Sequence, residues 1–314
     1  MTSAVTVRTS ARRIDVTGED RTRYLDDVTS QRLVDVPVGE VRGTLYLDAH
    51  GAPMAMFDVA VLDDRLVLVV PDGDVMDTVV EVLGGRTFLL DARFAATDDA
   101  VVALRGEDAG TVARAAGVDT GAGRVRVEDG ALLVGRDDGA VDVAGPAAAV
   151  AGVVQRLQTA GATEGTNRDL LRWRVSAGVP AWGSEVRPPH LPEEAGLLPT
   201  HVHLAKGCYP GQEAVARMWM LGRPRRRLAV VEPARGAVVE PGWEFGGGRR
   251  AVTVTSVSPD GDRALAFVPG DAAPGDAFTD DGGAGVEVVR LVGDHPAPPG
   301  HDPAVTRRRD RPRA

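Results

Sequence analysis

The sequence predicts an α+β fold built from several parts, and two patterns carry this prediction. Between residues 99 and 160, strand-like and helix-like runs alternate with hairpins, which is the pattern of a ferredoxin-like subdomain. Between residues 223 and 294, short strand-like runs are separated by Gly-rich turns, which is typical of a small closed β-barrel or sandwich. Hairpins and amphipathic helices occupy residues 1–98 and 161–222, which we expect to form one discontinuous α+β domain.

Local patterns assign each element along the chain. Tyr24, Leu25 and Val28 recur at helical spacing, and Gly84 and Gly85 end the next helical pattern. Helices are predicted at residues 20–28, 74–83, 109–116, 147–160, 166–176 and 212–221. Apolar runs bounded by Gly, Pro and Asp predict strands, three of them as hairpins within residues 43–70. The other strands are predicted at 11–16, 86–90, 101–104, 124–127, 131–135, 141–144, 227–231, 237–239, 251–257, 263–268 and 286–292.

The composition indicates a soluble globular protein. Apolar residues make up 43% and charged residues 26% of the 314-residue chain, which is ordinary for that class. No apolar run approaches the roughly 20 residues of a membrane span, and residues 1–13 lack the apolar core of a signal peptide. A single cysteine excludes an intramolecular disulfide, and we expect a reducing, cytoplasmic setting.

The formal net charge of −9 argues against nucleic-acid binding unless basic residues cluster. They cluster at residues 223–227 and 307–313. The first cluster either faces an anionic ligand or complements the dipole of the helix it follows. The second lies in a Pro- and Arg-rich tail, residues 295–314, which has little to bury. We expect this tail to be disordered and to serve solubility rather than recognition.

The only cysteine, Cys208, lies in the run KGCYPGQE at residues 206–213. Two glycines and a proline around it predict a tight turn. The helix predicted from Gln212 onward places the thiol just before a helix N-terminus, and Lys206 is two residues away. Both features favour the thiolate form. The residues alone leave two readings open, a reactive thiol or a small buried core residue.

The run KGCYPGQEAVAR resembles the signature of the YgfZ family of folate-binding proteins, which are related to the glycine-cleavage T-protein, an aminomethyltransferase. All seven fixed positions of the pattern K-G-C-Y-x-G-Q-E match. Other blocks follow in the family's order, and the resemblance covers about residues 12–290. These blocks are VTGEDRTRYLDDVTSQ, RWRVSAGVPAWGSE, LPEEAGLLPTHVHLAKGC and GRPRRRLAVV. The resemblance implies a three-part ring around a folate-binding channel, closed by a C-terminal β-barrel.

The resemblance also implies a function. It is that of a folate-binding protein that supports assembly or repair of iron–sulfur clusters in partner enzymes, more an accessory factor than an enzyme. In this reading Cys208 is the working group and Lys206 tunes it. Glu213 and Arg217 are four residues apart and so able to pair on one helical face. The residues expected to bind tetrahydrofolate are Tyr209, Gln212, Glu213, Arg217, Asp58 and Trp182.

A second function stays open, that of an enzyme that transfers or removes a one-carbon group with tetrahydrofolate as acceptor. The position of the family's hairpin aspartate holds Met56, while Asp58 lies one step along the same strand face. Ser176 stands where aminomethyltransferases carry a glutamate that holds the pterin. Both departures argue against transferase chemistry, which needs a carboxylate within reach. A third reading is a scaffold whose signature only fixes a domain junction.

A metal site is the weakest alternative. His201 and His203, spaced by two on a predicted extended chain, form with Cys208 a nominal zinc-binding set. This spacing is common and no fourth ligand stands out. We therefore interpret the two histidines as strand residues that flank the site, and we expect no resident metal.

Overall fold

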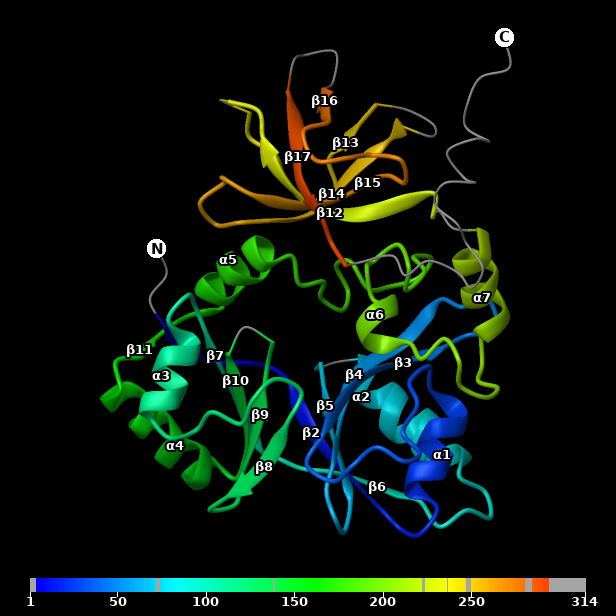
Figure 1. The fold of residues 1–314 in the computed structure, drawn as a ribbon, viewed down its shortest axis with the longest axis vertical. Helices are drawn as coiled ribbons and strands as arrows, with labels where there is room; N and C mark the ends of the chain where they lie inside the picture. Colours follow the sequence, from blue (N-terminus) through cyan, green and yellow to red (C-terminus); the bar gives the residue numbers. More distant parts are fainter. Residues whose placement is uncertain are drawn as a thin grey trace.

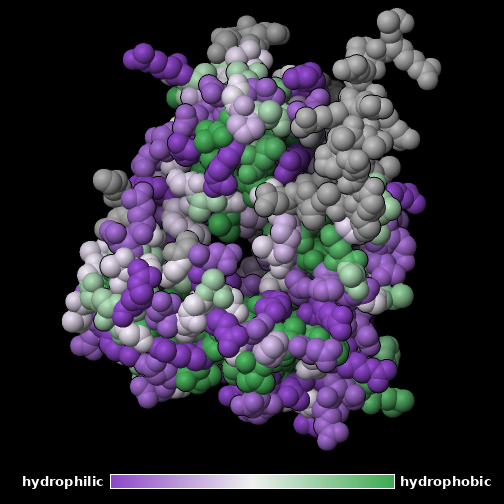
Figure 2. Space-filling view, viewed as in Figure 1, coloured by the Kyte–Doolittle hydropathy of each residue, from purple (hydrophilic) through white to green (hydrophobic). Residues whose placement is uncertain are grey.

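Three sheets organise the chain, and the mixed α and β architecture is confirmed (Figure 1). The computed structural model describes residues 4–71, 74–137, 139–221, 224–235, 237–246, 250–279 and 284–293. Two sheets lie side by side in the lower half of the view and the third lies above them, with α5 (Asn167–Ala177) and α6 (Leu198–His201) in between. Figure 2 shows a hollow near the middle of this face. The predicted tail at residues 295–314 lies outside the described residues.

The first sheet contains the strands predicted between residues 99 and 160, together with two strands that no pattern predicted. Its order is β11 (Thr163–Glu164), β1 (Val5–Arg8), β7 (Ala100–Arg105), β10 (Val141–Gly145), β9 (Ala131–Gly135) and β8 (Val125–Glu128). The helices α3 (Ala109–Ala115) and α4 (Ala147–Thr159) pack their apolar faces on it. Because β1 pairs with both β7 and β11, the first residues of the chain complete a sheet whose other strands come much later.

The second sheet contains the three predicted hairpin strands and the strand predicted at residues 11–16, together with β6, which no pattern predicted. Its order is β3 (Val41–Leu47), β4 (Pro53–Val61), β5 (Leu66–Val70), β2 (Arg12–Thr17) and β6 (Arg93–Ala96). One face packs against α1 (Arg21–Val28) through residues such as Phe57 and Leu25. Along β4, side chains alternate between this core and the opposite face, which carries Met56 and Asp58.

The segment after β5 departs from the prediction of a regular helix followed by a strand at residues 86–90. The helix α2 (Asp74–Asp77) continues as a π-helical turn (Thr78–Leu83) and a 3-10 turn (Gly84–Arg86). The Tyr24 hydroxyl donates to the carbonyl of Leu83 at 2.6 Å and fixes this helical stretch against α1. The predicted strand is wrong, because the chain reverses at Phe88, whose φ is 51°. Phe88 and Leu89 are 89% and 101% exposed.

The third sheet is barrel-like and contains four of the predicted strands. Its order is β13 (Glu244–Phe245), β14 (Val252–Val257), β15 (Ala264–Pro269), β12 (Arg226–Pro233), β17 (Gly285–Leu291) and β16 (Ala277–Thr279). Phe245 and Phe278 fill its core among valines and alanines. The strand predicted at residues 237–239 is wrong, since this stretch is irregular and Val238 is exposed.

A buried ion pair fastens the third sheet to α5 and to the long loop that follows this helix. Arg174 on α5 donates to Glu185 Oε2 at 2.8 Å, and the Glu185 side chain is fully buried. Ser256 on β14 donates to Glu185 Oε1 at 2.7 Å and accepts from Arg174 Nη2 at 2.6 Å. The N–H of Ala181 donates to the same carboxylate at 2.9 Å. Helix, loop and barrel thus share one hydrogen-bonded charge pair.

Further along this loop, His190 is buried against the barrel. Its ring stacks on Phe267 of β15, with ring centroids 4.2 Å apart. Burial lowers the pKa of His190 to about 4, and Arg226 and Arg187 lower it further against an opposing effect of Glu185. The folded protein therefore holds this imidazole neutral at physiological pH.

Glu193 lies on the same loop, and its pKa is shifted in the opposite direction. Burial raises the pKa of Glu193 to about 7, the carboxylate of Glu194 adds to the rise, and Arg227 opposes it. Glu194 itself is engaged, since it accepts from Arg226 at 3.3 Å and from the N–H of Leu191 at 3.1 Å. The loop thus carries two groups with shifted pKa values, His190 and Glu193, where it docks on the barrel.

These two pKa shifts act on stability with opposite signs. His190 is protonated near pH 6.5 in the unfolded chain and only near pH 4 in the folded chain. Protonation of His190 therefore favours the unfolded chain, and the free energy of unfolding falls as the pH falls from 6.5 to 4. Glu193 ionises near pH 4.5 when unfolded and near pH 7 when folded, so its contribution is lost as the pH rises from 4.5 to 7. We expect the two to offset one another in the wild-type chain between pH 4.5 and 6.5.

Single substitutions are expected to separate the two contributions. In this range His190→Gln leaves Glu193 unopposed, so its unfolding free energy should fall with rising pH. Glu193→Gln leaves His190 unopposed, so its unfolding free energy should rise with pH. Urea denaturation at three pH values measures both slopes. Parallel pH profiles for the wild type and the two variants would contradict the assignment.

Candidate functional site

A glycine fixes the turn that carries Cys208 against the second sheet. Cys208 is exposed and precedes α7 (Gln212–Leu221). Gly211 has a φ of 81° and lies so close to the β3–β4 hairpin that a Cβ would sit 2.5 Å from the carbonyl oxygen of Asp48. No other residue fits there without moving the hairpin. The second glycine of the signature therefore anchors the start of α7 and leaves the thiol at the surface.

Hydrogen bonds beside this turn join two sequence blocks that lie far apart in the chain. The Ser30 hydroxyl donates to the carbonyl of His201 at 2.7 Å, and the N–H of His203 donates to the carbonyl of Ser30 at 2.9 Å. Gln31 Nε2 donates to the carbonyl of Thr200 at 3.2 Å. The loop after α1 thus positions the segment that leads to Cys208.

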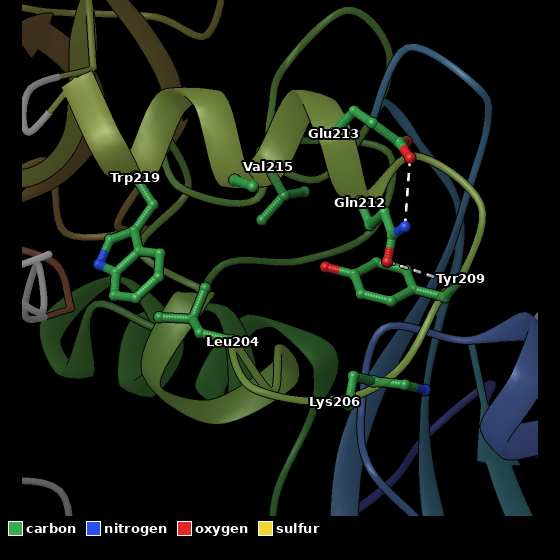
Figure 3. Close-up of a pocket in the computed structure, with 8 residues that line it drawn as sticks. Leu204, Lys206, Tyr209, Gln212, Glu213, Val215 and Trp219 are labelled. Atoms are coloured by element: carbon green, nitrogen blue, oxygen red, sulfur yellow. Dashed lines mark hydrogen bonds between the residues drawn. The ribbon is translucent and has the colours of Figure 1, made fainter. Parts of the chain in front are cut away.

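Lys206 is the only lysine of the chain, and its amino group points into this loop, away from the middle of the hollow described below (Figure 3). Its side chain is only 2% exposed. The ammonium donates to the carbonyls of Asp26, Thr29 (2.7 Å) and Gln31 (3.1 Å). Burial lowers the pKa of Lys206, and the Asp26 carboxylate, 3.7 Å away, opposes this. An ammonium has three N–H donors, so these three hydrogen bonds to the loop use all the donors of Lys206.

A hollow of about 190 Å³ lies between α7 and the segment leading to Cys208 (Figure 3). Its lining residues are Leu204, Lys206, Tyr209, Gln212, Glu213, Val215, Ala216 and Trp219. The ring and hydroxyl of Tyr209 project between α7 and Leu204. Gln212 closes the first turn of α7, since it accepts from the N–H of Tyr209 at 3.3 Å and donates to Glu213 at 3.1 Å.

The hollow combines an apolar interior with an anionic rim. Burial raises the pKa of Tyr209 to about 12, and the charge of Glu213 adds to the rise. Hydrogen bonds from Gln212 and from its own backbone N–H lower the pKa of Glu213, which is fully exposed and ionised. The spacing makes a pair of Glu213 with Arg217 possible, but among the described residues no ion pair joins the two, and Arg217 is exposed. The rim therefore keeps its negative charge.

Asp58 lies elsewhere, between the first and second sheets. Its carboxylate pairs with Arg136, at the end of β9, at 2.7 Å. Arg136 Nε also donates to Asp142 on β10 at 2.7 Å. Burial opposes the charge of Arg136, but Asp142 and Asp58 outweigh it and raise the pKa of the guanidinium. Asp58 is therefore engaged in an ion pair with Arg136 and is not a free general base.

This cluster extends to α5, and no sequence pattern predicted it. Arg105 Nη2 lies 2.6 Å from Asp142 Oδ1, and its guanidinium covers the ring of Trp173 at 4.8 Å. Burial alone would raise the pKa of Asp142, but Arg105 and Arg136 lower it. The sequence does contain a signal, because Asp142 interrupts an apolar strand and a carboxylate is buried in this way only when it is paired.

His201 ends α6 and does not lie in a strand, so the prediction that His201 and His203 share one face of an extended chain is wrong. The ring of His201 covers Gly43, where a Cβ would be 2.8 Å from Nε2. Burial lowers the pKa of His201, which Asp58 raises and Arg136 lowers further. Within the residues that the structure describes, no group of three or more His, Cys, Asp or Glu side chains is arranged to hold a metal ion.

The residues predicted to bind folate do not converge on one pocket. Tyr209, Gln212 and Glu213 line the hollow beside α7, whereas Asp58 and Arg217 do not. Trp182 is held elsewhere, because its indole N–H donates to Asp74 at 3.0 Å. The hollow of about 190 Å³ is smaller than the sites of roughly 300–1,000 Å³ that hold drug-sized ligands, so a whole tetrahydrofolate does not fit it.

Comparison with known proteins shows the fold. No protein-family model matches the chain, and no curated protein sequence matches it. The solved structure of glycine cleavage system aminomethyltransferase T from Bartonella henselae is similar over 91% of this chain and 85% of its own, with a TM-score of 0.77 and 19% identity. Heterotetrameric sarcosine oxidase from Corynebacterium sp. U-96 covers 52% of this chain and 87% of its own at 14% identity, and its TM-score of 0.32 carries no argument.

At 19% identity, the likeness to aminomethyltransferase T is one of fold alone. No helix in the described ranges is both long enough and apolar enough to cross a membrane. The likeness in fold shows that the three sheets and the helices between them are arranged as in glycine-cleavage aminomethyltransferase T.

Proposed function

We propose that this chain is a cytoplasmic, folate-binding accessory protein that uses Cys208 to support the assembly or repair of iron–sulfur clusters in partner enzymes. The observation that carries the proposal is an exposed thiol, the only one in the chain, on a turn held by buried contacts on both sides. Such a thiol, on losing its proton, is a ligand for cluster iron. The match of residues 206–213 to the YgfZ signature supports the same reading.

Folate binding, in this proposal, takes place in the central hollow of a three-part ring and not beside α7. The side chains of Asp58 and Arg136 are 21% and 27% exposed, so polar groups of a pterin can reach them between the first two sheets. The likeness in fold to an aminomethyltransferase supports this location. Tyr209, Gln212 and Glu213 then shape the surroundings of the thiol and do not contact the pterin.

The transferase alternative has no observation of its own in its favour. The carboxylate nearest to the expected position, Asp58, is neutralised by Arg136, and Met56 offers no proton acceptor. Ser176 presents only a hydroxyl on α5 where a carboxylate is needed. We therefore propose the accessory function alone.

Alkylation of Cys208 tests the proposal, because the chain has no other thiol to react. The rate is expected to rise about tenfold per pH unit while the thiolate fraction grows, and tetrahydrofolate is expected to change it. Cys208→Ser is expected to abolish alkylation and recovery of a damaged iron–sulfur enzyme in cells. Asp58→Asn serves as the matched control, since it should weaken the folate effect and leave the rate without folate unchanged. A thiol that stays inert at every pH and is indifferent to folate would overturn the proposal.

A further inference from the structure

The turn at Phe88 and Leu89 carries the two most exposed large apolar side chains of the described residues, at 89% and 101%. Phe88 has a φ of 51°, a left-handed conformation that a bulky side chain adopts only at a cost in energy. Reciprocal hydrogen bonds hold the end of this turn, since the N–H of Asp91 donates to the Asp20 carboxylate at 2.9 Å and the N–H of Asp20 donates to the carbonyl of Asp91 at 3.0 Å. The fold thus fixes a turn that directs two apolar side chains into solvent.

The strand β6 follows this turn and ends the second sheet (Figure 1). Among the described residues, no strand pairs with the side of β6 that faces away from β2. The N–H of Thr97, just after β6, donates to the carbonyl of Arg13 at 3.0 Å. Because hydrogen bonding alternates along an antiparallel pair, the backbone groups of Phe94 and Ala96 point away from β2. Ala95 and Ala96 are small and exposed, so another strand can approach this edge closely.

The charges at the two ends of β6 favour one orientation of such a strand. Arg93 begins β6 and is 74% exposed, and Asp98 lies just beyond its other end with a fully exposed side chain. The contacts of Arg93 with Asp91 and of Asp98 with Arg12 are themselves exposed, so they are weak and can exchange partners. Two copies of β6 that lie antiparallel bring the Arg93 end of each beside the Asp98 end of the other. The edge is therefore complementary in charge to itself.

We propose that two copies of the chain associate about a two-fold axis through this surface, with their β6 strands paired antiparallel and with Phe88 and Leu89 of each copy packed on the other. Exposed side chains of this size present about 150–200 Å² each, so the two copies together remove about 700 Å² of apolar surface from water. The paired strands bring the interface to about 1,000 Å², the low end of specific interfaces, which corresponds to a weak dimer. The second sheet then continues across the axis. The inference stands independently of what Cys208 does.

Sedimentation equilibrium of the full chain between about 5 and 500 µM tests the association. The mean mass of the wild type should rise from 32.9 kDa towards twice that value. The double variant Phe88→Ser with Leu89→Ser should keep the mass of the monomer at every concentration, and its exposed positions leave the fold intact. Val238→Ser is the matched control, because Val238 is 73% exposed but lies between β12 and β13, and this variant should associate as the wild type does.

Ala96→Pro tests the pairing of the strands separately. The N–H of Ala96 points away from β2, so a proline there keeps the hydrogen bonds of the second sheet and removes only an outward donor. We expect this variant to weaken the association about tenfold and to leave the circular dichroism spectrum unchanged. Unchanged association would contradict the pairing of the two β6 strands.

Three further outcomes would overturn the inference. A wild-type chain that stays monomeric throughout means that this surface does not bind a second copy and is open to a different protein. Association that persists in the double variant places the interface elsewhere. A mean mass that passes that of the dimer indicates open-ended assembly and not a two-fold pair. Each of these outcomes leaves the alkylation test of Cys208 intact, so the two proposals fail separately.

Discussion

Replacing Lys206 with methionine is expected to lower the free energy of unfolding by about 2–4 kcal/mol. The methionine keeps the apolar stem but leaves three buried carbonyl groups, those of Asp26, Thr29 and Gln31, without their donor. Chemical denaturation followed by circular dichroism measures the loss. Because these carbonyls belong to the loop that holds residues 200–206, the same variant should also speed hydrogen exchange around Cys208.

Lys206→Arg is the informative control for this site. The other 35 cationic side chains of the chain are arginines, so a single retained lysine indicates a geometry that a guanidinium does not meet. An ammonium is compact and directs three donors at three carbonyls, whereas a planar guanidinium needs more room than a site that is 2% exposed provides. We expect Lys206→Arg to lose nearly as much stability as the methionine variant. Full stability in Lys206→Arg would show that charge alone matters there.

Glu185→Ala is expected to lower the free energy of unfolding by about 3–5 kcal/mol, because it leaves the Arg174 guanidinium without its carboxylate partner at the buried junction with the barrel. The side chain of Arg174 is 14% exposed and that of Glu185 is fully buried, so water does not replace the lost partner. Ser256 loses its acceptor in the same step. Thermal and urea unfolding of the variant measure the effect, and a loss of cooperativity between the barrel and the rest would appear as a second transition.

Two comparison variants define what Glu185 contributes. Replacing both charges, Arg174→Met with Glu185→Leu, should recover most of the lost stability, because no unpaired charge remains buried. Asp260→Ala breaks the solvent-exposed contact that Arg172 makes with the same barrel, at 2.5 Å and 3.0 Å, and should have a much smaller effect. If Glu185→Ala and Asp260→Ala prove equally mild, the junction does not depend on the buried pair.

Regular elements were predictable where local signals agreed. The helix α5 has a capping box at Thr166 and a left-handed glycine at Gly178, and it was predicted to within a residue or two. The strands β1 and β11 were not predictable in this way. They are short, and they become strands only because each finds its partner in a distant part of the chain. The strand predicted at residues 86–90 does not form, because Phe88 and Leu89, although apolar, lie in an exposed turn.

The candidate site was predictable only as a turn with a thiol beside a helix. The roles of Lys206 and Asp58 depend on partners that are close in space but distant in sequence, Gln31 and Arg136 respectively. Lys206 is two residues from Cys208 in sequence, yet its ammonium donates its hydrogen bonds to the loop after α1. Spacing therefore identified the residues, but only the fold shows that they do not share one pocket.

The position of β1 also sets the order in which the molecule can be made. Thr6 on β1 bonds the carbonyl of Thr163, 157 residues later. At about 5–20 residues per second, a ribosome needs on the order of ten seconds to deliver that neighbour. The second sheet, assembled from consecutive hairpins, can form during this interval, whereas the first sheet stays open at β1. In a nascent chain, β1 therefore keeps one edge unpaired until β11 has been made, although its other edge can pair with β7 earlier.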